Sequence, residues 1–134
     1  MKRLIFAFAL WLGALGAAFG QSSVFVPATT TTTPITGTVA TATRIIPGIS
    51  GKSIYVTALN LVPVATSVVT LTAGTGTACG TGTVSLTGAM TFAAGQTVSL
   101  GNGYGTVLVV PQSTDLCITI STAASPGSIA YSLF

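Results

Sequence analysis

Few side chains in this sequence are suited to catalysis or to metal binding. The chain has 134 residues but no His, and its single acidic residue is Asp115. A zinc site needs several His or Cys ligands, a calcium site several carboxylates, and a glycosidase a pair of carboxylates. A Ser–Lys dyad with Lys52 as the base has the residue types, but nothing around Lys52 supports it. We therefore expect a protein that is not an enzyme and that holds no metal or cofactor.

Two glycine-containing segments resemble parts of nucleotide-binding motifs. Gly51-Lys52-Ser53 resembles the end of a phosphate-binding loop, but Ile46 stands where the first glycine is required, and a β-like run follows instead of a helix. Gly101-Asn102-Gly103-Tyr104-Gly105 lacks the βαβ unit and the later acid of a dinucleotide site. Both segments are predicted to be turns. Tyr104 and Asn102 in the second are candidate contacts for a glycan or a protein partner.

Cys79 and Cys117 are predicted to form a disulfide, because two cysteines in an exported chain read most simply as one bond. Two buried free thiols are the alternative. Closing the loop between the two residues should stabilise the fold by roughly 4 kcal/mol on the chain-entropy estimate. Cys117 alternates with apolar neighbours, so the bond is expected to tie its strand to the glycine-rich loop at residues 74–82 and not to bridge two sheets.

Asp115 has two basic residues as candidate partners, Arg44 and Lys52. A buried carboxylate without a partner is costly, so Asp115 should either be a solvated turn residue or form an ion pair. Arg44 is the better partner, because a guanidinium can hold a carboxylate with two hydrogen bonds. A third option places Asp115 beside Lys52 and an Asn, where it would promote an isopeptide crosslink.

The N-terminus has the pattern of an export signal. Two basic residues precede an apolar run from Leu4 to Leu15, and Ala18-Phe19-Gly20 places small residues at both positions that a signal peptidase reads. We predict a signal peptide over residues 1–20 that is cleaved after Gly20. An uncleaved membrane anchor is the alternative, but the run is short for a bilayer span. The expected location is extracellular, at a cell surface or at a virion surface, with no membrane span after cleavage.

The chain that remains after cleavage is almost without charge. Of the four basic residues, two lie in the predicted signal peptide, which leaves Arg44 and Lys52 against Asp115. Binding to nucleic acid needs many Lys or Arg side chains together and is not expected. Soluble domains usually carry a well-charged surface, so its absence here indicates self-association, for example into a polymer.

Residues 21–43 are expected to be an arm or linker outside the folded domain. They contain Pro27, Pro34 and an unbroken run from Thr29 to Thr33, and they lack an apolar face. The arm would either be flexible and glycosylated or add a strand to a neighbouring subunit. Truncating it is expected to leave a folded domain over residues 44–134 that assembles less well.

From Arg44 onward, short β-like runs alternate with Gly, Pro and Asn, which is typical of a β-sandwich or barrel. We predict an all-β fold, a single antiparallel β-sandwich of about eight short strands. The expected strands lie near residues 53–61, 67–72, 83–87, 90–93, 97–100, 106–110, 116–121 and 128–134. Alternation predicts that Leu116, Ile118 and Ile120 face the core, as do Ile129, Tyr131 and Leu133.

Several turn and strand segments of this domain resemble small β-sandwich proteins of tailed-phage virions, of the capsid-decoration or head-fibre kind. They are Gly51-Lys52-Ser53-Ile54-Tyr55-Val56-Thr57, Gly74-Thr75-Gly76-Thr77, Cys79-Gly80-Thr81-Gly82, Leu86-Thr87-Gly88-Ala89-Met90, Leu116-Cys117-Ile118 and Gly127-Ser128-Ile129-Ala130-Tyr131. The resemblance implies a jelly-roll-like domain that trimerises on a particle surface. The predicted signal peptide departs from that family, whose members assemble inside the host cell.

Two functions from different classes therefore remain. The first is a non-enzymatic structural subunit of an extracellular or virion surface assembly, such as a coat, decoration or fibre protein. The second is a secreted adhesin or carbohydrate-binding module that uses Tyr104 and the glycine-rich loops.

Overall fold

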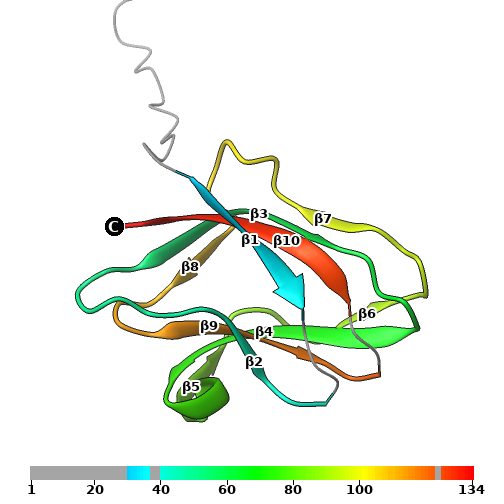
Figure 1. Cartoon of the computed structure of the whole chain (residues 1–134), viewed down its shortest axis with the longest axis horizontal. Coiled ribbons are helices and arrows are strands. Elements are labelled where there is room, and N and C mark those ends of the chain that lie inside the picture. The colour runs from blue at the N-terminus through cyan, green and yellow to red at the C-terminus, as the bar shows by residue number, and fades with distance from the viewer. Residues whose placement is uncertain (1–29, 37–39, 123–124) are drawn as a thin grey trace, which may run out of the picture.

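The computed structural model arranges the chain in two layers of strands (Figure 1), and it describes residues 30–36, 40–122 and 125–134. The predicted signal peptide lies outside the described residues. The elements are β1 (Thr31–Thr36), β2 (Thr43–Ile46), β3 (Ile54–Leu61), β4 (Ser67–Thr75), the short helix η1 (Thr77–Cys79), β5 (Thr81–Ser85), β6 (Met90–Phe92), β7 (Val98–Leu100), β8 (Leu108–Val110), β9 (Asp115–Ile120) and β10 (Pro126–Leu133).

The strands form two antiparallel sheets. One has the order β1-β10-β3, and both β7 and β8 pair with the side of β3 that β10 leaves open. The other has the order β2-β9-β4, with β5 and β6 both paired to β4. When β5 with β6 and β7 with β8 are each counted as one interrupted edge strand, this is the order of an eight-stranded jelly roll. The predicted all-β sandwich fold is confirmed.

Alternation along β9 and β10 places the core as the sequence predicts. Leu116, Ile118 and Ile120 of β9 are completely buried, and so is Ile129 of β10. Tyr131 and Leu133 are partly buried and pack against the same core. Cys117 points to the opposite face of β9 but is also fully buried. Its burial comes from η1, which lies over that face of the sheet.

A β-bulge keeps both halves of β3 in the core. Ala130 of β10 pairs with Ala58, but the next residue, Tyr131, pairs with Val56, so Thr57 is the extra residue in β3. Without the bulge, a strict period of two would turn one half of the strand outward. The hydroxyl of Thr57 donates a hydrogen bond of 3.2 Å to the carbonyl of Ala130, so the buried hydroxyl of this extra residue has a partner on β10.

The expected boundary of the folded domain at Arg44 is corrected by β1. This strand lies inside the segment expected to be an arm, yet it pairs with β10 of its own chain over its whole length. Ile35 is only 1% exposed and belongs to the core. The sandwich therefore begins at Thr31, and the eight strands expected from the sequence correspond to β3–β10, with β1 and β2 added.

Among the described residues, no helix is long and apolar enough to cross a membrane.

Candidate functional site

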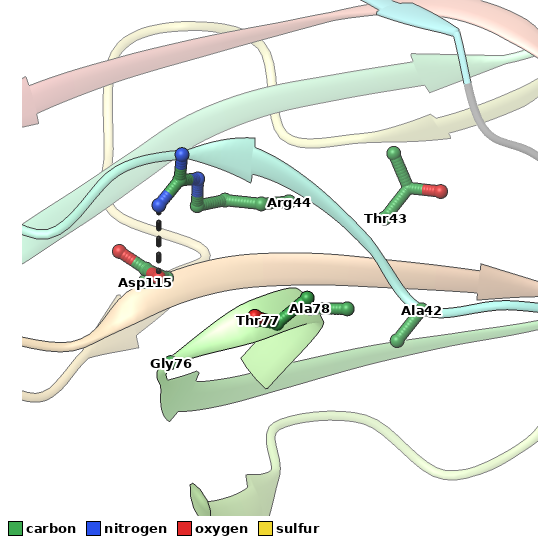
Figure 2. A pocket seen from close by; sticks show the side chains of 7 residues that line it. All are labelled: Ala42, Thr43, Arg44, Gly76, Thr77, Ala78 and Asp115. Carbon is green, nitrogen blue, oxygen red and sulfur yellow. Dashed lines mark ion pairs between the residues drawn. The ribbon is translucent and has the colours of Figure 1, made fainter. Parts of the chain in front are cut away.

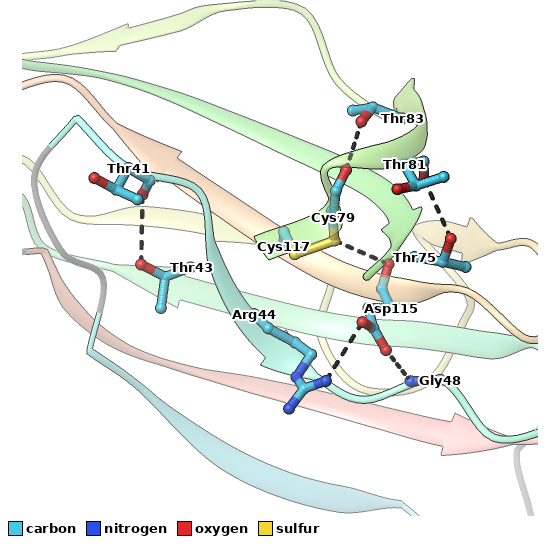
Figure 3. The surroundings of a disulfide bond; sticks show 10 residues. All are labelled: Thr41, Thr43, Arg44, Gly48, Thr75, Cys79, Thr81, Thr83, Asp115 and Cys117. Atoms are coloured by element: carbon cyan, nitrogen blue, oxygen red, sulfur yellow. Dashed lines mark hydrogen bonds and ion pairs between the residues drawn. A yellow bond between two sulfur atoms is a disulfide. The ribbon is translucent and has the colours of Figure 1, made fainter. Parts of the chain in front are cut away.

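The predicted disulfide between Cys79 and Cys117 is confirmed. The two sulfur atoms are 2.04 Å apart, and both residues are buried. Cys79 ends η1 and Cys117 lies in β9, so the bond fastens the 76–80 turn onto the outer face of one sheet, as the sequence predicts (Figure 3). Cys79 Sγ also lies 3.6 Å from the carbonyl oxygen of Asp115. A disulfide sulfur carries no proton, so this is a contact and not a donated hydrogen bond.

The turn that carries Cys79 has an unusual backbone. Ala78 and Cys79 both have positive φ, at 52° and 57°, a region that costs a residue with a side chain roughly 1–2 kcal/mol. Gly74 in β4 allows the turn to lie close, because a Cβ there would be 2.6 Å from the carbonyl oxygen of Cys79. Thr83 helps to hold the turn, since its hydroxyl donates to that same carbonyl.

Asp115 forms an ion pair with Arg44, which is one of the alternatives that the sequence left open. Its Oδ2 is 3.6 Å from Nη1 of Arg44, and its Oδ1 accepts a 2.7 Å hydrogen bond from the backbone N–H of Gly48. The Asp115 side chain is 13% exposed, whereas that of Arg44 is 55% exposed. Asp115 is therefore not a solvated turn residue. It joins the start of β9 to β2 and to the loop after β2.

The ion pair forms one wall of a shallow groove beside the disulfide (Figure 2), with a volume of about 640 Å³. The groove runs between β2 and η1 and is lined by Ala42, Thr43, Arg44, Gly76, Thr77, Ala78 and Asp115. Its polar groups are hydroxyls, backbone groups and one ion pair. They can hydrogen-bond to a polar ligand.

Sequence reasoning missed the Thr residues of this groove. Thr43 and Thr77 come from segments that are distant in the chain, and neither has a recognisable motif. The signal that could have located Thr77 is the cysteine pair, because a bond from Cys79 to Cys117 must bring the 74–82 loop to the strand that begins at Asp115.

Tyr104 lies on a different surface, as an exposed loop residue. Its side chain is 69% exposed, and its backbone N–H donates to Oδ1 of Asn102 at 3.2 Å. The loop is held to β3 in the other sheet, since Gly103 N–H donates to the carbonyl of Thr57. The structure therefore does not bring Tyr104 and Asn102 together with Arg44 and Asp115.

Lys52 lies in the turn before β3, where the sequence places a turn and no phosphate-binding loop. Its side chain is exposed, its N–H donates to the carbonyl of Ile49, and its own carbonyl accepts from Ser113. An isopeptide crosslink of Lys52 with an Asn, promoted by Asp115, has no support, because the Asp115 carboxylate pairs instead with Arg44 and with the Gly48 N–H.

Within the described part of the chain, no three His, Cys, Asp or Glu residues gather to form a metal site. The comparisons with known proteins add no relative: no family model, no curated protein and no solved structure matches this chain.

Replacing Asp115 should cost more stability than replacing Arg44. Asp115→Ala leaves the Gly48 N–H without its charged acceptor, so we expect the free energy of unfolding in urea to fall by about 2 kcal/mol. Arg44→Gln removes only a half-exposed partner and should cost less than about 1 kcal/mol. Asp115→Asn keeps an oxygen that can accept from the Gly48 N–H, so its loss in the free energy of unfolding should lie between those of the other two variants. Three equal losses within experimental error would contradict this assignment.

Proposed function

We propose that this chain is a non-enzymatic structural subunit of an exported surface assembly and that it builds this assembly by self-association. The observation that carries the proposal is the scarcity of charge on the sandwich. Only Arg44, Lys52 and Asp115 are charged beyond residue 20, and Arg44 and Asp115 neutralise each other in one ion pair. Identical copies then meet almost no electrostatic repulsion, whereas a well-charged surface keeps domains apart.

The sheet edges support association between copies. Edge strands expose unpaired backbone groups, and proteins that stay monomeric usually protect them with charged residues or Pro. β5 is an edge strand whose residues are all exposed. Its sequence, Thr-Gly-Thr-Val-Ser, contains no charged residue and no Pro. A strand of another copy can therefore pair with β5 without a charge or a Pro in the way.

The fold and the disulfide are compatible with a role outside the cell. Jelly rolls occur in viral capsid proteins and in lectin domains, so the fold favours both functions considered above, by analogy only. A disulfide within the chain suits an oxidising compartment. We propose the narrower role of a coat, decoration or fibre protein that forms trimers, on the resemblance of its turn segments to phage virion proteins.

The second candidate function is a secreted adhesin or carbohydrate-binding module. It is favoured by the exposed ring of Tyr104, which can stack on a sugar, and by the hydroxyl groups of the groove beside the disulfide. In that case the protein would stay monomeric and bind a glycan through one of these two surfaces.

Light scattering coupled to size-exclusion chromatography of the full exported protein separates the two functions. A structural subunit should show a mass several times that of the monomer, and the mass should fall on dilution if exchange is fast. Val84→Lys places a charge on β5, where Val84 is 53% exposed, and should reduce assembly. Val64→Lys changes an equally apolar, exposed residue in the β3–β4 loop and serves as the matched control. A monomer at all concentrations would contradict the proposal.

A further inference from the structure

The two interrupted edge strands leave an opening on the same side of the sandwich. β7 pairs with residues 59–61 of β3 and β8 with residues 54–56, so no strand pairs with Thr57 and Ala58 on this side. In the facing sheet, β6 pairs with residues 67–69 of β4, and β5 pairs from Thr72 onward. Leu71 lies at that second interruption. Its carbonyl accepts hydrogen bonds from the N–H groups of Leu86 and Thr87, and its own N–H donates to the Thr87 hydroxyl.

A small apolar pocket lies between the sheets at this opening. It has a volume of about 140 Å³, and its walls are mainly aliphatic side chains of β3, β4, β7 and β8. These side chains belong to Val56, Leu59, Leu71, Leu100 and Leu108. All but Leu100 and Leu108 are fully buried, so the pocket reaches the core of the sandwich and opens toward the 101–107 loop.

The polar groups that border this pocket already have partners. The hydroxyl of Thr87 accepts a 3.0 Å hydrogen bond from the N–H of Leu71. On the other wall, the carbonyls of Val56 and Thr57 accept from Val107 and Gly103. A water molecule in a cavity needs two to four polar partners, and apolar cavities without them stay dry. The pocket therefore offers mainly shape and apolar contact, with the O–H of Thr87 as a remaining hydrogen-bond donor at its border.

The 101–107 loop at the rim of the pocket lies close against the backbone of β3. Gly101 has φ of 75° and lies so close to β3 that a Cβ would be 2.4 Å from the carbonyl oxygen of Thr57. The loop is further fastened by the 2.8 Å hydrogen bond from Val107 N–H to Val56. Together with the hydrogen bond from Gly103 N–H to the carbonyl of Thr57, this fastens the loop to β3 at two points.

We propose that this pocket is a binding site for a compact, uncharged, apolar molecule of roughly six to eight non-hydrogen atoms. An apolar cavity of about 150 Å³ in another protein takes up benzene, which sets the size class for a pocket of this volume. The scarcity of free hydrogen-bonding groups selects against polar ligands of the same size, since a buried hydroxyl would lose most of its water partners. This site does not depend on the proposed structural function.

Benzene is the probe for the test, and methyl NMR spectra of the full exported protein report where it binds. We expect saturable shifts of the Val56, Leu71 and Leu108 methyl signals, with none at Ile118, which is buried in the core but does not line the pocket. Phenol has the same ring and one hydroxyl, so it should bind at least ten-fold more weakly. Shifts that do not saturate, or that spread evenly over the core, would overturn the proposal.

A larger side chain that fills the pocket should weaken benzene binding. Leu108→Phe adds volume at a partly buried wall position, and benzene binding should weaken at least ten-fold. Leu133→Phe makes the same change at a partly buried core position outside the pocket and should bind benzene as the parent does. If Leu108→Phe does not fold, Leu100→Phe fills the pocket from β7 instead. Folded filling variants that bind benzene as tightly as the parent would refute the assignment.

Discussion

Removing the disulfide with the paired change Cys79→Ala and Cys117→Ala should lower the free energy of unfolding by about 4 kcal/mol. The bond closes a loop across a sequence separation of 38 residues, and the chain-entropy estimate for such a loop has this size. In a domain of this length, each kcal/mol shifts the melting temperature by about 4–8 °C. We therefore expect thermal unfolding, followed by circular dichroism, to occur more than about 15 °C lower.

A reductant provides the matched control for this experiment. Dithiothreitol should lower the melting temperature of the parent toward that of the double variant and should leave the double variant unchanged. Hydrogen exchange should also quicken first at residues 76–80, because the strained backbone at Ala78 and Cys79 is then held to the sheet mainly by hydrogen bonds. Equal melting temperatures for the parent and the double variant would show that the bond adds nothing to stability.

Ile35→Ala should also be strongly destabilising, although Ile35 lies in the segment expected from its sequence to be an arm. Ile35 is almost fully buried in the core and belongs to β1, which pairs with β10. Shortening a buried Ile to Ala typically costs 2–5 kcal/mol, and we expect about 3 kcal/mol here. Urea unfolding measured at several protein concentrations checks this value, and a midpoint that does not depend on concentration would show that β1 acts within one chain.

Thr32→Ala is the matched control for Ile35→Ala. Thr32 lies in the same strand but is exposed, so its replacement should change the stability by less than about 0.5 kcal/mol. Equal, small effects of both variants would mean that β1 does not belong to the core of its own sandwich. An unfolding midpoint of the parent that rises with protein concentration would instead indicate that copies exchange β1.

The class of fold and most of the strands follow from local patterns in the sequence. The alternation of Leu116, Ile118 and Ile120 predicted their burial correctly, because side chains in a strand point to opposite faces with a period of two. Turn residues marked the ends of β3–β10 within a few positions. The small number of reactive side chains was equally informative, since a chain with two cysteines and one carboxylate leaves few pairs to choose from. The predicted disulfide is present, and the pair of Arg44 with Asp115 is one of the alternatives that the sequence left open.

Only the tertiary structure decided where β1 belongs and where the pockets lie. The run of Thr and Pro around Ile35 has no periodic apolar face, and its place comes from pairing with β10, far away in the sequence. The groove at Arg44 and the apolar pocket at Leu71 are likewise built from segments that no local pattern connects. Local periodicity determines which way a side chain points in a strand, but the register between distant strands determines what it meets.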